Sequence, residues 1–233
     1  MFTLRMRGRN DDRKGKLMKR ILTNKERNLL EKRIAAAEKL TGAQIVLAVI
    51  ERSDLYSELP WKAFALGVSL AGLLIFIFDF LWASRCSPTM VLISVGAMLI
   101  TGILSALLSL YIPKFARFFL SVHRAEAEVR QYAESLFLSR ELYATRRRTG
   151  VLLLVSIFEH QIILLPDKGH NRKLNQKVMQ NIIEQMKPSL VSGQTARALE
   201  IGLAGLEGRL AGKKRGKSRK NELSNLIIEE KGV

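Results

Sequence analysis

The sequence has very little cysteine, histidine and proline, and it lacks the short motifs that mark several large enzyme classes. Cys86 is the only cysteine among 233 residues, so no intrachain disulfide can form and a secreted disulfide scaffold is excluded. The three histidines, His123, His160 and His170, have no metal-ligand spacing to one another or to Cys86. No Walker-type phosphate loop, dinucleotide fingerprint or Gly-x-Ser-x-Gly elbow occurs. The sequence therefore offers no linear motif for catalysis.

The N-terminus lacks an apolar run before Ile21, so it does not read as a secretory signal peptide, and a later apolar helix is expected to direct membrane insertion. The net charge is +17, and Lys and Arg crowd a basic N-terminal tail, residues 1–20, and a charged flexible tail, residues 213–233. Such runs attract anionic lipid headgroups or nucleic acid, or only fix membrane orientation. Apart from Phe2, no aromatic residues interleave with them, so a nucleic-acid partner is not expected.

Two apolar runs, 63–82 and 90–112, lie within residues 61–113. Each has about 20 residues, the length that crosses a hydrocarbon core of roughly 30 Å as a helix. The first run contains one ionisable residue, Asp79, and the second contains none. Neither run shows the polar face of a soluble core helix. The pattern predicts a transmembrane helical hairpin.

Aromatic residues stand at the ends of these runs, where interfacial anchors are expected: Trp61, Trp82 and Tyr111. Asp79 lies about one turn from Trp82 and is expected to reach the interface, with an ion-pathway role as the alternative. Small residues four apart favour close helix packing, in the pairs Gly67–Ala71 and Gly102–Ala106.

The placement of Lys and Arg predicts the orientation. The short connection between the runs carries only Arg85, whereas the other ends carry several cations, namely Arg52, Lys62, Lys114, Arg117 and Arg124. By the positive-inside rule, both termini face the cytoplasm and Cys86 faces outside. We therefore expect a multi-pass protein of the cytoplasmic (inner) membrane whose lipid bilayer is its first partner.

The remaining sequence predicts a small α/β sandwich in two parts, 21–60 and 114–212. The first part reads as a helix, 23–40, and a buried strand, 43–51. The apolar stripe of that helix is expected at Leu29, Leu30, Ile34, Ala37 and Leu40. The second part reads as a helix (114–143), two antiparallel strands (151–158 and 161–167) and two further helices (171–187, ending before Pro188, and 192–210).

Three segments follow one another in a distinctive order: TGAQIVLAVI (41–50), RTGVLLLVSIFEHQIILLPDKG (148–169) and SGQTARALEIGLAGLEGRL (192–210). Together they resemble the TPM domain family, in particular its bacterial membrane members with a hairpin inserted after the first strand. The resemblance extends over most of residues 21–212 outside the hairpin. It implies a fold of the α/β class, a three-layer α/β/α sandwich interrupted by the two-helix transmembrane hairpin.

The resemblance also implies two kinds of function. Some family members bind divalent cations and are assigned acid phosphatase activity, and others are membrane-associated accessory factors. In the cation-binding members the loop before the Gly-Val-Leu-Leu strand is rich in Asp and Asn, whereas here it holds Arg146, Arg147 and Arg148. A metal is therefore not expected in that loop. Asp167 is the acidic residue at a family loop position; it is a candidate ligand for Ca²⁺ or Mg²⁺, or a turn former before Gly169.

These observations favour a non-enzymatic interaction or accessory module at the membrane surface, without a cofactor. Its expected partners are other membrane proteins or anionic lipid headgroups. The three arginines at 146–148 are the candidate site for an anion or an acidic partner, or else a solvated helix end. The alternatives are a cation-dependent phosphatase-like hydrolase and a subunit of a membrane transport complex.

Overall fold

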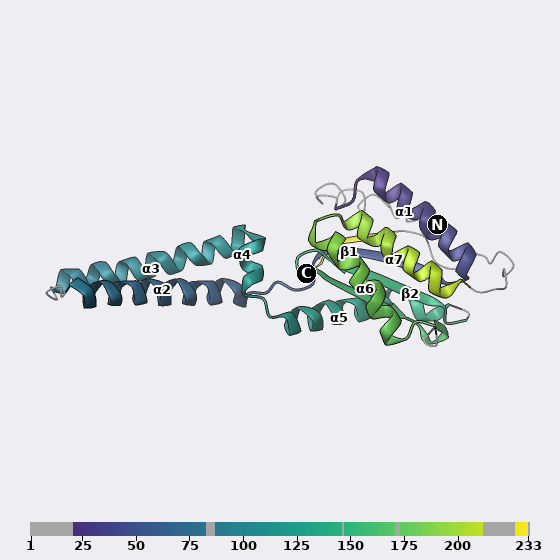
Figure 1. Cartoon of the computed structure of the whole chain (residues 1–233). Coiled ribbons are helices and arrows are strands. Elements are labelled where there is room, and N and C mark those ends of the chain that lie inside the picture. Colours follow the sequence, from purple (N-terminus) through teal and green to yellow (C-terminus); the bar gives the residue numbers. More distant parts are fainter. Residues whose placement is uncertain (1–20, 83–86, 146, 171–172, 212–226, 233) are drawn as a thin grey trace, which may run out of the picture. The chain divides into compact units, whose positions relative to one another are not determined.

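The computed structural model describes residues 21–82, 87–145, 147–170, 173–211 and 227–232. They form two compact units (Figure 1). The sheet unit comprises residues 1–51 and 133–232, and the hairpin unit comprises residues 52–132. One strand and one helix pass from one unit into the other, since the divisions fall at the end of β1 and within α5.

The sheet unit is built on four strands in the order β3-β2-β1-β4. The strands are β1 (Gln44–Arg52), β2 (Gly150–Ser156), β3 (Gln161–Pro166) and β4 (Ile228–Gly232). β1 and β2 are parallel, with Gln44 opposite Gly150 and Ile50 opposite Ser156. β2 and β3 form the predicted antiparallel pair. The mixed α/β class is therefore confirmed, and residues far apart in the sequence meet in one sheet.

One face of this sheet is covered by α1 (Asn24–Thr41), α6 (Gln176–Val191) and α7 (Thr195–Leu210) (Figure 1). The odd-numbered residues of β1 and β2 point into this layer because successive strand residues face opposite sides. They pack into a core with side chains of the three helices, among them Ile34, Met186 and Leu203. Leu47, Leu153 and their helix partners are fully buried.

The opposite face of the sheet is covered as well, and the two ion pairs of β4 show this. Glu229 and Glu230 are successive strand residues, so their side chains point to opposite faces. Glu229 pairs with Arg27 of α1, whereas Glu230 pairs with Arg140, which directly follows α5 (Val122–Ser139). α1 and the end of α5 therefore lie on opposite sides of the sheet, as a three-layer sandwich requires.

The expected apolar stripe of α1 is correct at its centre and wrong at its edges. Leu30, Ile34 and Ala37 are buried, but Leu29 and Leu40 are 51% and 61% exposed. A helix turns by about 100° per residue, so Leu29 and Leu40 lie roughly 80–100° away from the line through the buried three. The helix begins with a capping box between Thr23 and Glu26 and ends at Gly42, which has φ of 71°.

Three further boundaries differ from expectation. The helix expected at 114–143 is divided into α4 (Pro113–Phe118), α5 and a short 3₁₀ turn, η2 (Leu142–Ala144). Ser121 makes the division, because its hydroxyl accepts a hydrogen bond from the Arg124 N–H and starts a new helix. α6 starts at Gln176 and continues through Pro188 to Val191, since a proline one turn from the end removes only one helical hydrogen bond.

The hairpin unit contains α2 (Glu58–Trp82) and α3 (Pro88–Tyr111), which are long and apolar enough to cross a membrane. Only 6% of the most apolar window of each helix is buried inside the structure. The two helices meet at the small residues, because a Cβ added to Gly67 would lie 2.4 Å from Ser105 Oγ. One added to Gly102 would lie 2.6 Å from Val68 Cγ2. Close packing at these glycines is thus confirmed.

Glu38 gives the sheet unit a specific pH dependence. Burial raises the pKa of its carboxyl from 4.5 to about 7. The hydrogen bond that Oε1 accepts from the Ile45 N–H at 2.9 Å acts in the opposite direction and lowers this pKa. Between pH 4.5 and about 7 the folded protein keeps a proton that the unfolded chain has lost, so the stability of the fold falls as pH rises through about 7.

Glu38→Gln keeps the hydrogen-bond acceptor and removes the charge. We expect its melting temperature to exceed the wild-type value at pH 8 and to match it at pH 5; an equal difference at both pH values would contradict this.

Candidate functional site

The arginine loop before β2 is a tight turn whose side chains face solvent. Arg147 and Arg148 are exposed, and Arg146 lies outside the described residues. Buried Thr145 holds the turn, because its carbonyl accepts the Arg148 N–H at 2.9 Å and its hydroxyl accepts the Thr149 N–H at 3.0 Å. Arg148 has φ of 53°, which a non-glycine residue adopts at a local cost. The loop thus presents two guanidinium groups on a fixed backbone.

A second turn, at the end of β3, is pressed against this loop. The Gly169 N–H donates to the Arg148 carbonyl at 2.9 Å, and the Asp167 N–H donates to the Gly150 carbonyl at 2.8 Å. A Cβ at Gly169 would lie only 2.3 Å from the Arg148 oxygen, so glycine permits the close approach. The contact places exposed Lys168 beside the arginines. We call Arg147, Arg148 and Lys168 the basic edge.

Asp167 and His170 form a buried layer beneath these cations. Asp167 is 6% exposed; its Oδ1 accepts the Lys168 N–H at 2.7 Å, and its Oδ2 has no hydrogen-bond partner among the described residues. His170 is 7% exposed and its Nε2 likewise has no such partner there. Burial, together with nearby Lys173, lowers the pKa of His170, with Asp167 acting in the opposite direction. His170 is therefore neutral at physiological pH.

These two side chains alone do not complete a ligand set for Ca²⁺ or Mg²⁺. Both ions prefer several oxygen ligands, usually carboxylates. The buried layer offers one free carboxylate oxygen and one imidazole nitrogen. Within the described residues, no group of three or more His, Cys, Asp or Glu side chains is placed to hold a metal. Asp167 has a structural role in the turn, since its Oδ1 accepts the Lys168 N–H.

The predicted membrane residues occupy the ends of the apolar helices. Trp61, Trp82 and Tyr111 are 73%, 71% and 81% exposed, as anchors in an interface would be. Trp61 meets Phe64 edge to face, and Trp82 stacks on Phe78. Asp79 is exposed on α2, near the Trp82 end. No atom of Cys86 or Arg85 is described, because both lie in residues 83–86.

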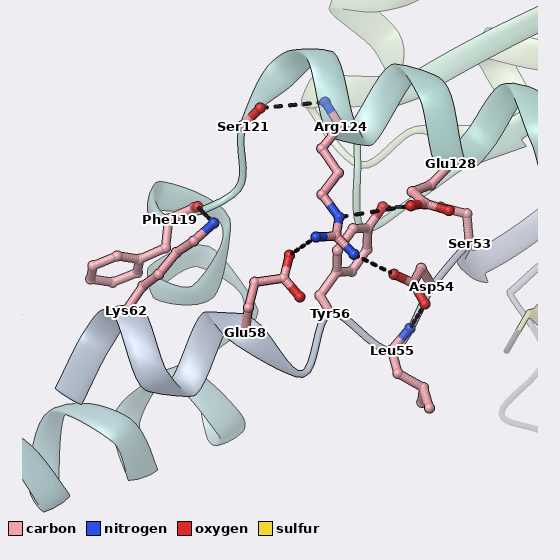
Figure 2. Close-up of polar contacts among 10 residues, drawn as sticks. All are labelled: Ser53, Asp54, Leu55, Tyr56, Glu58, Lys62, Phe119, Ser121, Arg124 and Glu128. Atoms are coloured by element: carbon pink, nitrogen blue, oxygen red, sulfur yellow. Dashed lines mark hydrogen bonds and ion pairs between the residues drawn. The ribbon is translucent and has the colours of Figure 1, made fainter. Parts of the chain in front are cut away.

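The hairpin unit also contains a charge cluster that sequence reasoning missed (Figure 2). Arg124 lies among three carboxylates: Glu58 at 2.9 Å, Asp54 at 3.3 Å and Glu128 at 3.7 Å. Its guanidinium also lies 5.9 Å from the ring centroid of Tyr56. We call this the Arg124 clasp. It joins the segment that enters α2 to the first turns of α5.

Further contacts lie around the clasp. Tyr56 is 1% exposed, has φ of 48°, and shares a hydrogen bond of 3.1 Å with Ser53. Lys62 Nζ of α2 lies 3.5 Å from the carbonyl of Phe119, which directly follows α4, and adds a further polar link close to the clasp. In the sequence Arg124 contributes only to the positive flank of the second apolar run. Its partners are up to 70 residues away, so no local pattern could reveal them.

Replacing Arg124 with alanine should loosen this junction. The three carboxylates would lose their shared cation, although the side chain of Arg124 is 45% exposed and each exposed pair contributes only about 0.2–1 kcal/mol. We expect Arg124→Ala to increase proteolysis within residues 53–58 and Arg124→Lys to restore protection only in part, because an ammonium group cannot serve three carboxylates as a planar guanidinium does. Equal protection in all three proteins would contradict the clasp.

Replacing Gly169 with alanine tests the contact between the two turns. The new Cβ would meet backbone rather than a flexible side chain, so the turns must separate. We expect faster hydrogen exchange at residues 148–150 and 167–170 in Gly169→Ala. Gly208→Ala is the control, since nothing lies within 4 Å of a Cβ there. Unchanged exchange in Gly169→Ala would show that the turns are not pressed together.

The comparisons with known proteins agree with this fold. The TPM domain model matches residues 115–209. This confirms the resemblance to the TPM domain family. Among solved structures, the chain is similar to the NMR structure of BA42 protein from the psychrophilic bacterium Bizionia argentinensis. The TM-score is 0.54 at 15% identity, over 91% of this chain and 97% of that one, so the likeness is one of fold. No curated protein matched the chain.

Proposed function

We propose that this chain is an integral membrane protein whose TPM-type domain is a non-enzymatic interaction module on the cytoplasmic side of the inner membrane. The observation that carries the proposal is the exposed apolar surface of α2 and α3, which water would not solvate favourably. A hairpin in the bilayer buries that surface in lipid. Because Lys and Arg flank the ends of the hairpin away from the short loop, the domain lies in the cytoplasm.

The membrane attachment is tested by extraction. The full chain should sediment with membranes and stay there after alkaline carbonate washing, which removes peripheral proteins. Release into the carbonate supernatant would contradict an integral hairpin. A control chain with charged substitutions in α2 should be released into the carbonate supernatant, which would show that the test responds to the apolar surface.

We further propose that the basic edge binds the anionic headgroups of the leaflet. Three exposed cations on two backbone-locked turns can meet phosphate oxygens, and the buried Asp167 and His170 add no exposed negative charge there. The basic segments near both ends of the sequence act in the same direction. Guanidinium groups suit phosphate geometry through their planar donors.

The headgroup proposal is tested in nanodiscs of phosphatidylcholine with and without phosphatidylglycerol. Addition of the anionic lipid should slow hydrogen exchange at residues 147–150 and 167–169 in the wild type. It should have no such effect when Arg147, Arg148 and Lys168 are all alanine. The matched control replaces three exposed cations of α1, namely Lys32, Arg33 and Lys39, and should behave as the wild type.

Equal hydrogen exchange with and without anionic lipid would overturn the headgroup proposal. Copurification of a membrane protein that depends on the basic edge would replace the lipid with a protein partner.

A divalent-cation-dependent phosphohydrolase is the second candidate, and one observation favours it. The Oδ2 atom of Asp167 is buried without a hydrogen-bond partner among the described residues, next to cations that suit a phosphate group. Such an enzyme would need further oxygen ligands for its cation. The discriminating experiment is hydrolysis of a generic phosphomonoester: activity that chelator and Asp167→Asn both abolish would favour the enzyme over the interaction module.

A further inference from the structure

The last strand of the sheet comes from the far end of the chain and lies at the edge beside β1. β4 (Ile228–Gly232) follows β1 (Gln44–Arg52) by more than 170 residues in the sequence. Without β4, the edge of β1 would present unpaired N–H and C=O groups above the apolar core. Such an edge accepts any extended segment whose side chains fit.

The side chains around β4 define which segment fits this edge. Ile227, just before the strand, is 2% exposed and belongs to the core. Arg27 contacts Glu229 at 3.7 Å, and its guanidinium also lies 3.4 Å from the Ile227 carbonyl. Arg140 contacts Glu230 at 3.2 Å on the opposite face. The edge of β1 therefore selects an apolar residue followed by two acidic residues, with one arginine for each face of the sheet.

β4 itself is a weak strand. It has five residues, IEEKG, and Glu, Lys and Gly are all depleted in strands. Its final Gly232 has φ of 78°, which ends the extended conformation. Both ion pairs are partly exposed, with Arg140 at 51% and Arg27 at 33%. Edge elements with few buried contacts open locally before the rest of a fold does.

We propose that the edge of β1 is a self-association site, at which β4 of one copy is replaced by β4 of a second copy of this chain. The second copy is the occupant that the geometry favours because its strand carries the same Ile227, Glu229 and Glu230 that the edge already recognises. Residues 211–227 connect α7 to β4 and can span roughly 55 Å when fully extended. That reach allows a strand to leave its own sheet and pair with a neighbour.

Charge reversal in full-length chains separates pairing within one copy from pairing between copies. The edge variant carries Arg27→Glu and Arg140→Glu, and the strand variant carries Glu229→Arg and Glu230→Arg. Either variant alone brings like charges together in every arrangement. When the two are coexpressed with different affinity tags, only pairing between unlike copies restores opposite charges at both faces. The strand variant's β4 then meets reversed charges beside the edge variant's β1, and the edge variant's β4 meets the native arginines beside the strand variant's β1.

We expect the two tagged variants to copurify about tenfold more than two tagged copies of either variant alone. A chain with all four substitutions is the control for folding, because it restores both ion pairs within one copy. Copurification of the mixed pair no greater than that of identical copies would overturn the proposal. So would failure of the mixed pair to accumulate while the control chain accumulates, or capture of a different protein that depends on Arg27 and Arg140.

Discussion

Gly102→Leu is expected to force α2 and α3 apart. Even a Cβ at this position would lie 2.6 Å from Val68 Cγ2 and 2.8 Å from the Phe64 ring, and leucine adds three further carbons. Helices that associate through small residues depend on this close approach. Overpacking in a well-packed contact costs about 1–3 kcal/mol, so the hairpin should lose a large part of its stability.

The measurement is the fraction of full-length protein that stays monodisperse in mild detergent after heating. Gly96→Leu is the matched control, since it makes the same substitution in the same helix at a position with nothing within 4 Å of a Cβ. We expect Gly96→Leu to behave as the wild type and Gly102→Leu to aggregate at a lower temperature. Equal behaviour of the two variants would mean that the helices do not pack through Gly102.

Leu30→Ala should destabilise the sheet unit far more than Leu29→Ala, although the two residues are neighbours in α1. Leu30 is fully buried in the core, whereas Leu29 is 51% exposed. Truncation of a buried leucine costs about 2–5 kcal/mol through lost burial and the cavity that remains. Truncation of an exposed leucine in a helix changes stability by less than about 0.5 kcal/mol, because alanine also favours the helix.

Urea unfolding of the full chain in detergent, followed by circular dichroism, measures this difference. The transition of the sheet unit should move to clearly lower urea in Leu30→Ala and stay in place in Leu29→Ala. If the two substitutions had equal effects, α1 would be rotated from the position described, and the core on its face of the sheet would be different.

The elements that the sequence predicts well are those whose signal is local. The two apolar runs have the length and uniformity of membrane helices, and α2 and α3 follow them closely. β1 and β2 are runs of aliphatic residues buried on both faces, which is typical of central strands in an α/β sheet. The glycines at 67 and 102 mark the helix contact because only a missing side chain allows it.

The features that the sequence does not reveal depend on partners far along the chain. β4 has a composition that reads as a charged tail, and it becomes a strand only because the edge of β1 and two arginines accept it. The Arg124 clasp gathers acidic residues from both sides of the hairpin. In the candidate site, the arginine loop was predicted, but its contact with the Lys168–His170 turn follows from the register of β2 and β3.

Labelling of Cys86 tests the central claim, a membrane-spanning hairpin with the domain in the cytoplasm, most directly. It is the only thiol of the chain and lies in the short connection between α2 and α3. A membrane-impermeant maleimide should label the wild type in intact cells. A Cys86→Ser chain with Lys32→Cys on the exposed face of α1 should be labelled only after permeabilisation. The reverse pattern would place the domain outside and contradict the orientation, and labelling of both cysteines only after permeabilisation would contradict a hairpin that crosses the membrane.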